Sequence, residues 1–219
     1  MRINQEVFDV RRQLINFKLT FIKKQSRWTE RMNLRGIMKK TVLFASMFLL
    51  TAAFLFSADF SDPEGWFAYD DSAAPNNGSS KIYIESSKSG DVLAVTAKGN
   101  VTKKFQYGFA GFGINPNPAE LANIKKAKGF KFKVKGDGRA YRVRANTSNI
   151  RDYNYFGKVF VTKPGQIVEV KVMYSELEQE SWGTKVSFNK NKINQFTFQT
   201  TEQPIASFSL TIIGFELIM

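Results

Sequence analysis

From residue 59 onward, hydrophobic and polar residues alternate with a period of two over several short segments. Residues 130–135 read Phe-Lys-Phe-Lys-Val-Lys, and residues 141–146 read Tyr-Arg-Val-Arg-Ala-Asn. This alternation is typical of β-strands that bury one face and expose the other. Residues 136–139, between the two segments, read Gly-Asp-Gly-Arg and supply the positive-φ positions that a tight turn requires. The pattern therefore predicts a β-hairpin over residues 131–146.

Similar segments, separated by short polar turns, predict further strands along the chain. They lie at residues 81–85, 92–97, 103–109, 155–161, 167–173, 193–199 and 208–218. In the last of them the hydrophobic phase changes near Gly214, which indicates a β-bulge or burial on both faces. Only residues 118–126 have the pattern of a short helix. Many short strands at close intervals predict an all-β, antiparallel sandwich or barrel.

An apolar segment nearer the N-terminus has the features of an export signal. The basic pair at residues 39–40 precedes a hydrophobic run that ends at Phe56, and residues 57–58 are small. These features define a secretory signal peptide, although Phe56 occupies a position where a small residue is expected. The run contains polar residues and is shorter than the roughly 20 apolar residues that span a bilayer. We therefore predict a signal peptide at residues 38–58, no stable membrane span, and an exported domain, periplasmic or secreted, at residues 59–219.

Residues 1–37 carry nine Lys/Arg and three Asp/Glu. They are interpreted either as a mis-assigned start, with translation beginning at Met38, or as a basic leader that binds nucleic-acid or membrane phosphates. The distribution of charge favours the first interpretation. Before residue 59 there are 11 of the 32 Lys/Arg but 3 of the 19 Asp/Glu, so +8 of the net charge of +13 lies there. The remaining charge is ordinary for a soluble domain, and we expect no nucleic-acid partner.

The composition removes several kinds of chemistry. The chain has no Cys and no His. Zinc sites built from these residues are therefore excluded, as are Ser-His-Asp and Cys-His nucleophile pairs. A hydrolase would have to use paired carboxylates, and no spacing of Asp and Glu singles out a pair. We predict a protein without catalytic activity.

Three segments resemble a known group of proteins. They are residues 59–62 (Asp-Phe-Ser-Asp), residues 130–141 with the Gly-Asp-Gly-Arg turn, and residues 207–215 (Ser-Phe-Ser-Leu-Thr-Ile-Ile-Gly-Phe). They resemble the galactose-binding-like jelly rolls, and within these the group that unites complex I intermediate-associated proteins with family 11 carbohydrate-binding modules. The resemblance covers residues 59–219. It implies a two-sheet antiparallel jelly-roll β-sandwich with a sugar-binding cleft on the concave sheet.

The resemblance also implies a structural calcium ion near the joined chain ends. Calcium takes about six to eight oxygen ligands. Asp59, Asp62 and Glu216 are the expected donors if the first and last segments pair. The alternative is that each of them is a solvated carboxylate.

For sugar recognition, planar polar groups bind hydroxyls and flat aromatic rings stack on the C–H faces of the pyranose. The expected ligand-binding residues are Arg142, Arg144, Asn146, Asp152, Tyr153, Tyr155 and Trp182. The alternative is that the rings fill the core or its rim and that the arginines face solvent. In the predicted hairpin, Lys131, Lys133 and Lys135 lie on the strand next to the arginines, which disfavours a neutral β-glucan. An acidic glycan or a protein partner suits such a face better.

We therefore predict an exported, non-catalytic module that recognises a glycan or polysaccharide on its concave sheet. The alternative is a structural or assembly protein of the cell envelope that acts through protein–protein contacts, as a lone small domain suggests. A third hypothesis is an assembly factor like the mitochondrial relatives, which the export signal disfavours. An enzyme acting on sugars is the last choice.

Overall fold

The computed structural model describes residues 60–219, which form ten β-strands, one α-helix and three short 3-10 helices. The strands are β1 (Trp66–Asp70), β2 (Lys81–Ser89), β3 (Val92–Val101), β4 (Ala110–Ile114), β5 (Gly129–Gly136), β6 (Ala140–Thr147), β7 (Phe156–Val161), β8 (Ile167–Met173), β9 (Ile193–Thr200) and β10 (Ile205–Ile218). The helices are η1 (Pro63–Gly65), α3 (Pro118–Ile124), η2 (Tyr174–Glu176) and η3 (Lys190–Lys192). The predicted leader, the signal peptide and Asp59 lie outside the described residues.

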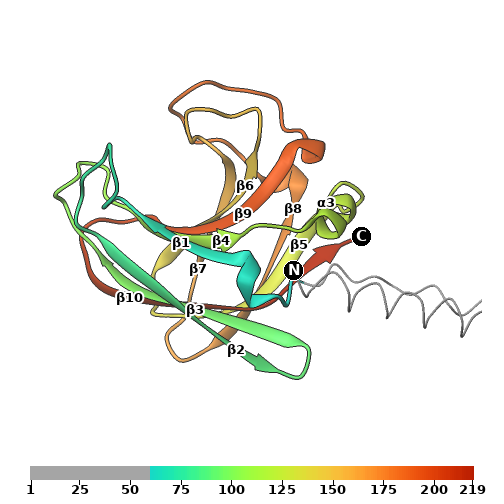
Figure 1. Ribbon diagram of the computed structural model, residues 1–219, viewed down its shortest axis with the longest axis horizontal. Helices are drawn as coiled ribbons and strands as arrows, with labels where there is room; N and C mark the ends of the chain where they lie inside the picture. Colours follow the sequence, from blue (N-terminus) through green and yellow to red (C-terminus); the bar gives the residue numbers. More distant parts are fainter. Residues whose placement is uncertain (1–59) are drawn as a thin grey trace, which may run out of the picture. The chain divides into compact units, whose positions relative to one another are not determined.

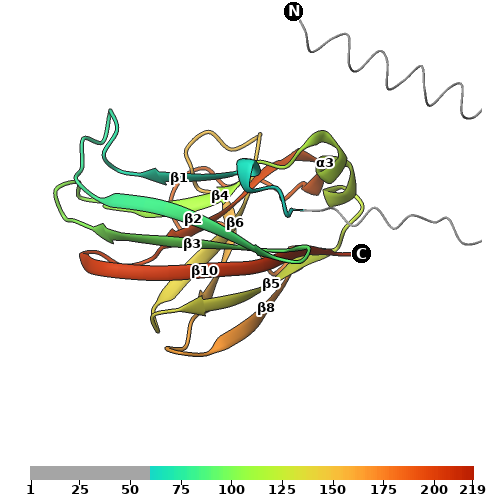
Figure 2. The ribbon, with the colours of Figure 1, turned by 60° about the horizontal axis from the view of Figure 1, so that its bottom comes forward.

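The strands form two five-stranded sheets packed face to face (Figure 1, Figure 2). Sheet A has the order β1-β4-β9-β6-β7, and sheet B has the order β2-β3-β10-β5-β8. All neighbouring strands in both sheets are antiparallel. The prediction of an all-β, two-sheet antiparallel sandwich is therefore confirmed for residues 60–219.

Aromatic rings hold the two sheets together. Phe196 and Phe198 point inward from sheet A and meet Phe130, Phe132 and Phe215 of sheet B. The ring centroids of Phe130 and Phe196 are 4.9 Å apart, and those of Phe132 and Phe198 are 5.2 Å apart. Phe130, Phe196 and Phe198 are fully buried. Each occupies an alternate position of its strand, which is how a period-two pattern places its apolar residues in a shared core.

The predicted hairpin over residues 131–146 is wrong. Its two strands exist as β5 and β6, but β5 pairs with β10 and β8 in sheet B, whereas β6 pairs with β9 and β7 in sheet A. The intervening segment forms a corner between the sheets, where Gly138 has a φ of +96°. Asp137 fixes this corner by accepting hydrogen bonds from Tyr141 Oη at 3.0 Å and Ser209 N at 3.3 Å. Both strands bury one face, so their alternation looks the same in a corner as in a hairpin.

The strand predicted at residues 103–109 is also wrong, because these residues form the loop between β3 and β4. Strands β1 and β4, of five residues each, were missed.

The predicted helix is present as α3. Its first turn is capped by Asn117, whose Oδ1 accepts from Ala119 N and Glu120 N, both at 2.9 Å. The bulge is confirmed at Gly214, where the register of β10 against β5 shifts. Across residues 60–219, none of the helices has the length and apolar character needed to cross a lipid bilayer.

Burial raises the pKa of the Tyr174 hydroxyl above its usual value of 10.0. Above pH 10 the unfolded chain releases this proton while the folded protein retains it, so the free energy of unfolding falls as the pH rises. We expect Tyr174→Phe to make this alkaline fall less steep. Urea unfolding between pH 8 and pH 11 measures the free energy of unfolding at each pH. Equal dependence of this free energy on pH in the two proteins would contradict the prediction.

Candidate functional site

Three rows of side chains cross the outer face of sheet A. The first is Tyr69, Gly111, Gln199, Arg142 and Val159; the second is Phe67, Gly113, Thr197, Arg144 and Gly157; the third is Gln195 and Asn146. The residues between them, such as Phe112, Phe198 and Val143, are buried in the core. Because successive side chains of a strand point to opposite faces, the three rows face outward.

Glycines on β4 allow the aromatic residues of β1 to lie across the sheet. A Cβ atom at Gly111 would stand 2.5 Å from the Cζ and Oη atoms of Tyr69. A Cβ atom at Gly113 would stand 3.1 Å from Cζ of Phe67. Both rings are partly exposed. The β1 side of this face is therefore an aromatic surface that rests on the two glycines of β4, whose other residues point into the core.

A polar network joins this aromatic surface to the middle of the sheet. Gln199 Oε1 accepts hydrogen bonds from Tyr69 Oη at 3.2 Å and from Arg144 Nη1 at 2.7 Å. Asn146 is 6% exposed; its amide donates to Gln195 Oε1 and accepts from Thr197 Oγ1, each at 3.2 Å. Burial raises the pKa of Tyr69, which keeps its hydroxyl protonated as a donor. The network holds polar groups in fixed positions beside the rings.

Arg142 and Arg144 lie side by side in the rows and keep unused donors. Arg142 Nη2 donates to the carbonyl oxygen of Glu178 at 2.6 Å, and Arg144 Nη2 lies 3.6 Å from Glu180 Oε2. The Nε atoms of both arginines are buried and have no hydrogen-bond partner. Burial lowers the pKa of Arg142, and the nearby Glu180 opposes this shift. A buried donor without a partner is unfavourable. Because these Nε atoms are closed to solvent, a ligand reaches the two arginines through the other atoms of their partly exposed side chains.

Buried Asn154 positions the loop that carries Glu180. Its Oδ1 accepts from Glu180 N at 2.9 Å, and its Nδ2 donates to the backbone oxygens of Glu180 and Trp182. Gln179 Nε2 donates to the carbonyl oxygen of Asn154 at 2.9 Å. These bonds tie the β8–β9 loop to the β6–β7 loop, and the two loops project together in Figure 1.

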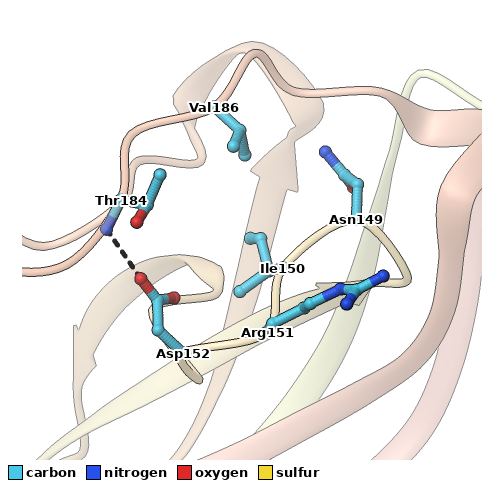
Figure 3. Close-up of a pocket in the computed structure, with 6 residues that line it drawn as sticks. All are labelled: Asn149, Ile150, Arg151, Asp152, Thr184 and Val186. Carbon is cyan, nitrogen blue, oxygen red and sulfur yellow. Dashed lines mark hydrogen bonds between the residues drawn. The ribbon is translucent and has the colours of Figure 1, made fainter.

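Asp152 braces the same two loops. Its Oδ2 accepts from Thr184 N at 2.6 Å and its Oδ1 from Asn154 N at 3.2 Å, and these backbone donors lower its pKa. Figure 3 shows Asp152 and Thr184, joined by the bond from Thr184 N, among the residues that line a hollow of about 290 Å³, together with Arg151. The carboxylate is therefore engaged within the protein, and its predicted contact with a ligand stays a prediction.

The three predicted aromatic residues differ in position. Tyr155 is partly buried. Burial raises its pKa, and the nearby charge of Arg144 only reduces this rise. Tyr153 is 72% exposed, and its ring meets that of Tyr155 edge-on at 6.4 Å. Trp182 is 47% exposed on the β8–β9 loop. The structure therefore brings Arg142 and Tyr155 into the region of Arg144 and places Tyr153 and Trp182 at its rim.

Two of the three residues predicted to bind calcium, Asp62 and Glu216, lie within the described part of the chain, and each has a partner in the protein. Asp62 Oδ1 accepts from Glu64 N at 3.0 Å, and Glu216 forms an ion pair of 2.9 Å with Lys131. Within residues 60–219, no three acidic side chains gather in a way that would hold a metal ion. Since Asp59 lies outside the described residues, the calcium ion stays a prediction.

Lys131, Lys133 and Lys135 are not on the strand next to the arginines. They lie on β5 of sheet B, opposite residues of β10 and β8, whereas Arg142 and Arg144 face outward from sheet A. The argument from these lysines against a neutral ligand therefore fails. The acidic residues beside the arginines are Glu180 and Glu178.

Sequence reasoning missed Phe67, Tyr69, Gln199, Glu180 and Asn154. A signal for the first two was present, because residues 66–69 alternate as Trp-Phe-Ala-Tyr and residues 111–113 read Gly-Phe-Gly. No sequence pattern indicates that these two short segments pair with each other.

The fold is a jelly-roll β-sandwich similar to that of two solved carbohydrate-binding modules. A family 11 carbohydrate-binding module from Clostridium thermocellum, solved in complex with a β-1,3-1,4-mixed-linked tetrasaccharide, superposes with a TM-score of 0.52 at 14% identity. The match covers 73% of this chain and 92% of that chain. The family 11 module of the cellulosomal cellulase Lic26A-Cel5E from the same organism gives a TM-score of 0.51 at 12% identity, over 74% and 91% of the two chains.

The profile of the complex I intermediate-associated protein 30 (CIA30) family matches residues 54–212. The chain therefore belongs to the CIA30 family, and the resemblance inferred from the sequence is confirmed. Among curated proteins, no relative matches.

Proposed function

We propose that this chain is an exported, non-catalytic glycan-binding protein and that it binds its ligand on the outer face of sheet A. One observation carries the proposal. Rings lying across the two glycines of β4 stand beside two partly exposed arginines whose guanidinium groups are held by hydrogen bonds. Flat rings and fixed polar donors are the two elements that sugar recognition requires. The proposed export follows from the signal-like segment at residues 38–58.

The charge of this face supports a neutral glycan. Arg144 is paired with Glu180, which also acts on Arg142. The lysine-rich strand that would have attracted an acidic glycan lies on the other sheet. Acceptor oxygens of sugar hydroxyls can pair with the accessible part of the arginines without bringing a further negative charge next to Glu180.

Isothermal titration of residues 59–219 against neutral and acidic polysaccharides, with calcium and again with chelator, tests this proposal. We expect saturable heat with a neutral β-glucan and a Kd about tenfold to a hundredfold higher in Arg144→Ala, because a charge-assisted hydrogen bond is lost. Lys133→Ala is the matched control, since it removes a positive charge from sheet B. A folded domain that gives no heat with any polysaccharide would refute the proposal.

The second candidate function is that of an assembly protein that acts through protein contacts, either in the cell envelope or as the family description suggests. It predicts that crosslinking in cells recovers a defined protein partner and that polysaccharides give no heat. Recovery of the protein only as a free monomer would count against it.

A further inference from the structure

A continuous row of aromatic rings leaves the outer face of sheet A and follows the loop between β3 and β4. It consists of Phe67, Tyr69, Phe109, Phe105 and Tyr107, which we call the aromatic row. Successive ring centroids are 6.0, 6.1, 6.4 and 5.8 Å apart. The first four rings are partly exposed, and Tyr107 at the far end is 68% exposed. Packing in the core does not account for a row in which every ring is at least partly exposed.

The loop that carries the last three rings is fixed at both ends by one buried pair, Asp71 and Ser80. Asp71 Oδ2 accepts from Phe109 N at 3.2 Å and from Ser80 Oγ at 2.7 Å. Ser80 Oγ in turn accepts from Thr102 N at 3.0 Å. Both Asp71 and Ser80 are fully buried. Figures 1 and 2 show the β3–β4 loop beside the β1–β2 loop at the same end of the sandwich.

Contacts within the loop add to this constraint. Gln203 Nε2 donates to the carbonyl oxygen of Gln106 at 2.6 Å, and Gly108 N donates to the carbonyl oxygen of Phe105 at 3.0 Å. A Cβ atom at Gly108 would stand 2.2 Å from the carbonyl oxygen of Thr102, so the turn is tightly closed. The rings are thus held in place before any ligand arrives, which lowers the entropy lost on binding.

We propose that the aromatic row extends the glycan site beyond sheet A, and that the ligand is a long unbranched polysaccharide. This inference rests on the proposed function. The outer face of sheet A, with its polar network, forms the floor of the proposed site. Tyr69 belongs both to the aromatic row and to this polar network, since its hydroxyl donates to Gln199 at 3.2 Å. A chain bound at the floor therefore continues onto Phe109, Phe105 and Tyr107, where successive sugar rings stack.

The surroundings of the loop favour a sugar chain over a protein or a lipid surface. Lys103, Lys104 and Gln106 are exposed between and beside the rings. The row is therefore a narrow strip of rings among polar groups, not the broad apolar patch that marks a protein or membrane contact. A polysaccharide presents C–H faces to rings and hydroxyls to polar side chains in the same way along its length.

Titration with a mixed-linked β-1,3-1,4-glucan polymer and with its tetrasaccharide tests the inference. In the unmodified protein the polymer should bind more tightly than the tetrasaccharide. Phe105→Ala/Tyr107→Ala should raise the Kd for the polymer about tenfold and leave the Kd for the tetrasaccharide unchanged. Tyr107→Ala alone, at an exposed position, should give a smaller loss of the same kind. Tyr83→Ala, which removes a 54% exposed ring from sheet B, is the control and should change neither Kd.

The outcomes separate this inference from the proposed function. Unchanged polymer affinity in the double variant, or equal losses for both ligands, would overturn the inference while the floor still binds. Absence of binding by the unmodified protein to either glucan, and to the wider polysaccharide panel, would overturn the proposed function and the inference with it. Binding of the polymer that requires Arg144 and both rings would support the two together.

Discussion

Replacing Asp71 with alanine is expected to lower the free energy of unfolding by about 3 kcal/mol. Asp71 is fully buried and accepts hydrogen bonds from Ser80 N at 3.0 Å, Ser80 Oγ at 2.7 Å and Phe109 N at 3.2 Å. Removal of the carboxylate leaves these donors without a partner in the interior. It also releases the β3–β4 loop, so binding of a long polysaccharide should weaken in the same variant.

Urea unfolding at neutral pH measures the change, and Asp70→Ala is the matched control. Asp70 is partly exposed, and its carboxylate accepts from Ser72 N at 2.9 Å and from the Ser72 hydroxyl. The loss in free energy of unfolding for Asp71→Asn should lie between those of the two alanine variants. The asparagine amide keeps one acceptor but turns the other into a donor that faces other donors. Equal stabilities for the Asp70 and Asp71 variants would show that the buried pair does not organise this end of the sandwich.

Phe130→Ala is expected to lower the free energy of unfolding by about 4 kcal/mol. Phe130 is fully buried and lies between both sheets, with ring centroids 4.9 Å from Phe196 and 5.3 Å from Phe215. Alanine leaves a cavity at the centre of the inter-sheet packing, and neighbours anchored in two separate sheets can close it only partly.

Chemical denaturation also measures this effect, with Phe105→Ala as the comparison. Phe105 has the same side chain but lies partly exposed in a loop, so its removal should lower the free energy of unfolding by about 1 kcal/mol. A loss at Phe130 as small as that at Phe105 would mean that the core is more plastic than its packing indicates.

The faces of the strands that were recognised were predictable from the sequence, because a period of two determines which side chains share a face. This is why Arg142, Arg144 and Asn146 were placed together and are found together on the outer face of sheet A. The same reasoning identified the apolar inner face of residues 130–134, which the core confirms.

Strand partners were not predictable in this way. Alternation is identical for a strand that turns back into its own sheet and for one that crosses to the other, so the Gly-Asp-Gly-Arg corner was taken for a hairpin. This error placed Lys131, Lys133 and Lys135 beside the arginines. It led to the expectation of an acidic glycan or a protein partner instead of a neutral glycan. The aromatic surface was missed because β1 and β4 are short. The glycines of β4 indicate a binding surface only when they are known to lie beneath Phe67 and Tyr69, which the sequence does not show.

The course of β10 has a mechanical consequence. Its first residue, Ile205, lies opposite Val101, where the loop of the aromatic row begins, while Phe215 near its other end packs against Phe60 at 4.9 Å. Ten residues of extended strand separate these points by about 30 Å. A bead or surface attached at Met219 would therefore hold the molecule at the end far from its rings. Strand β10 lies between β3 and β5 and is hydrogen-bonded to both. Tension along a bound polymer would therefore act parallel to β10 and load both ladders of hydrogen bonds in shear. All these bonds would resist the force together, whereas an edge strand pulled sideways loses its bonds one at a time.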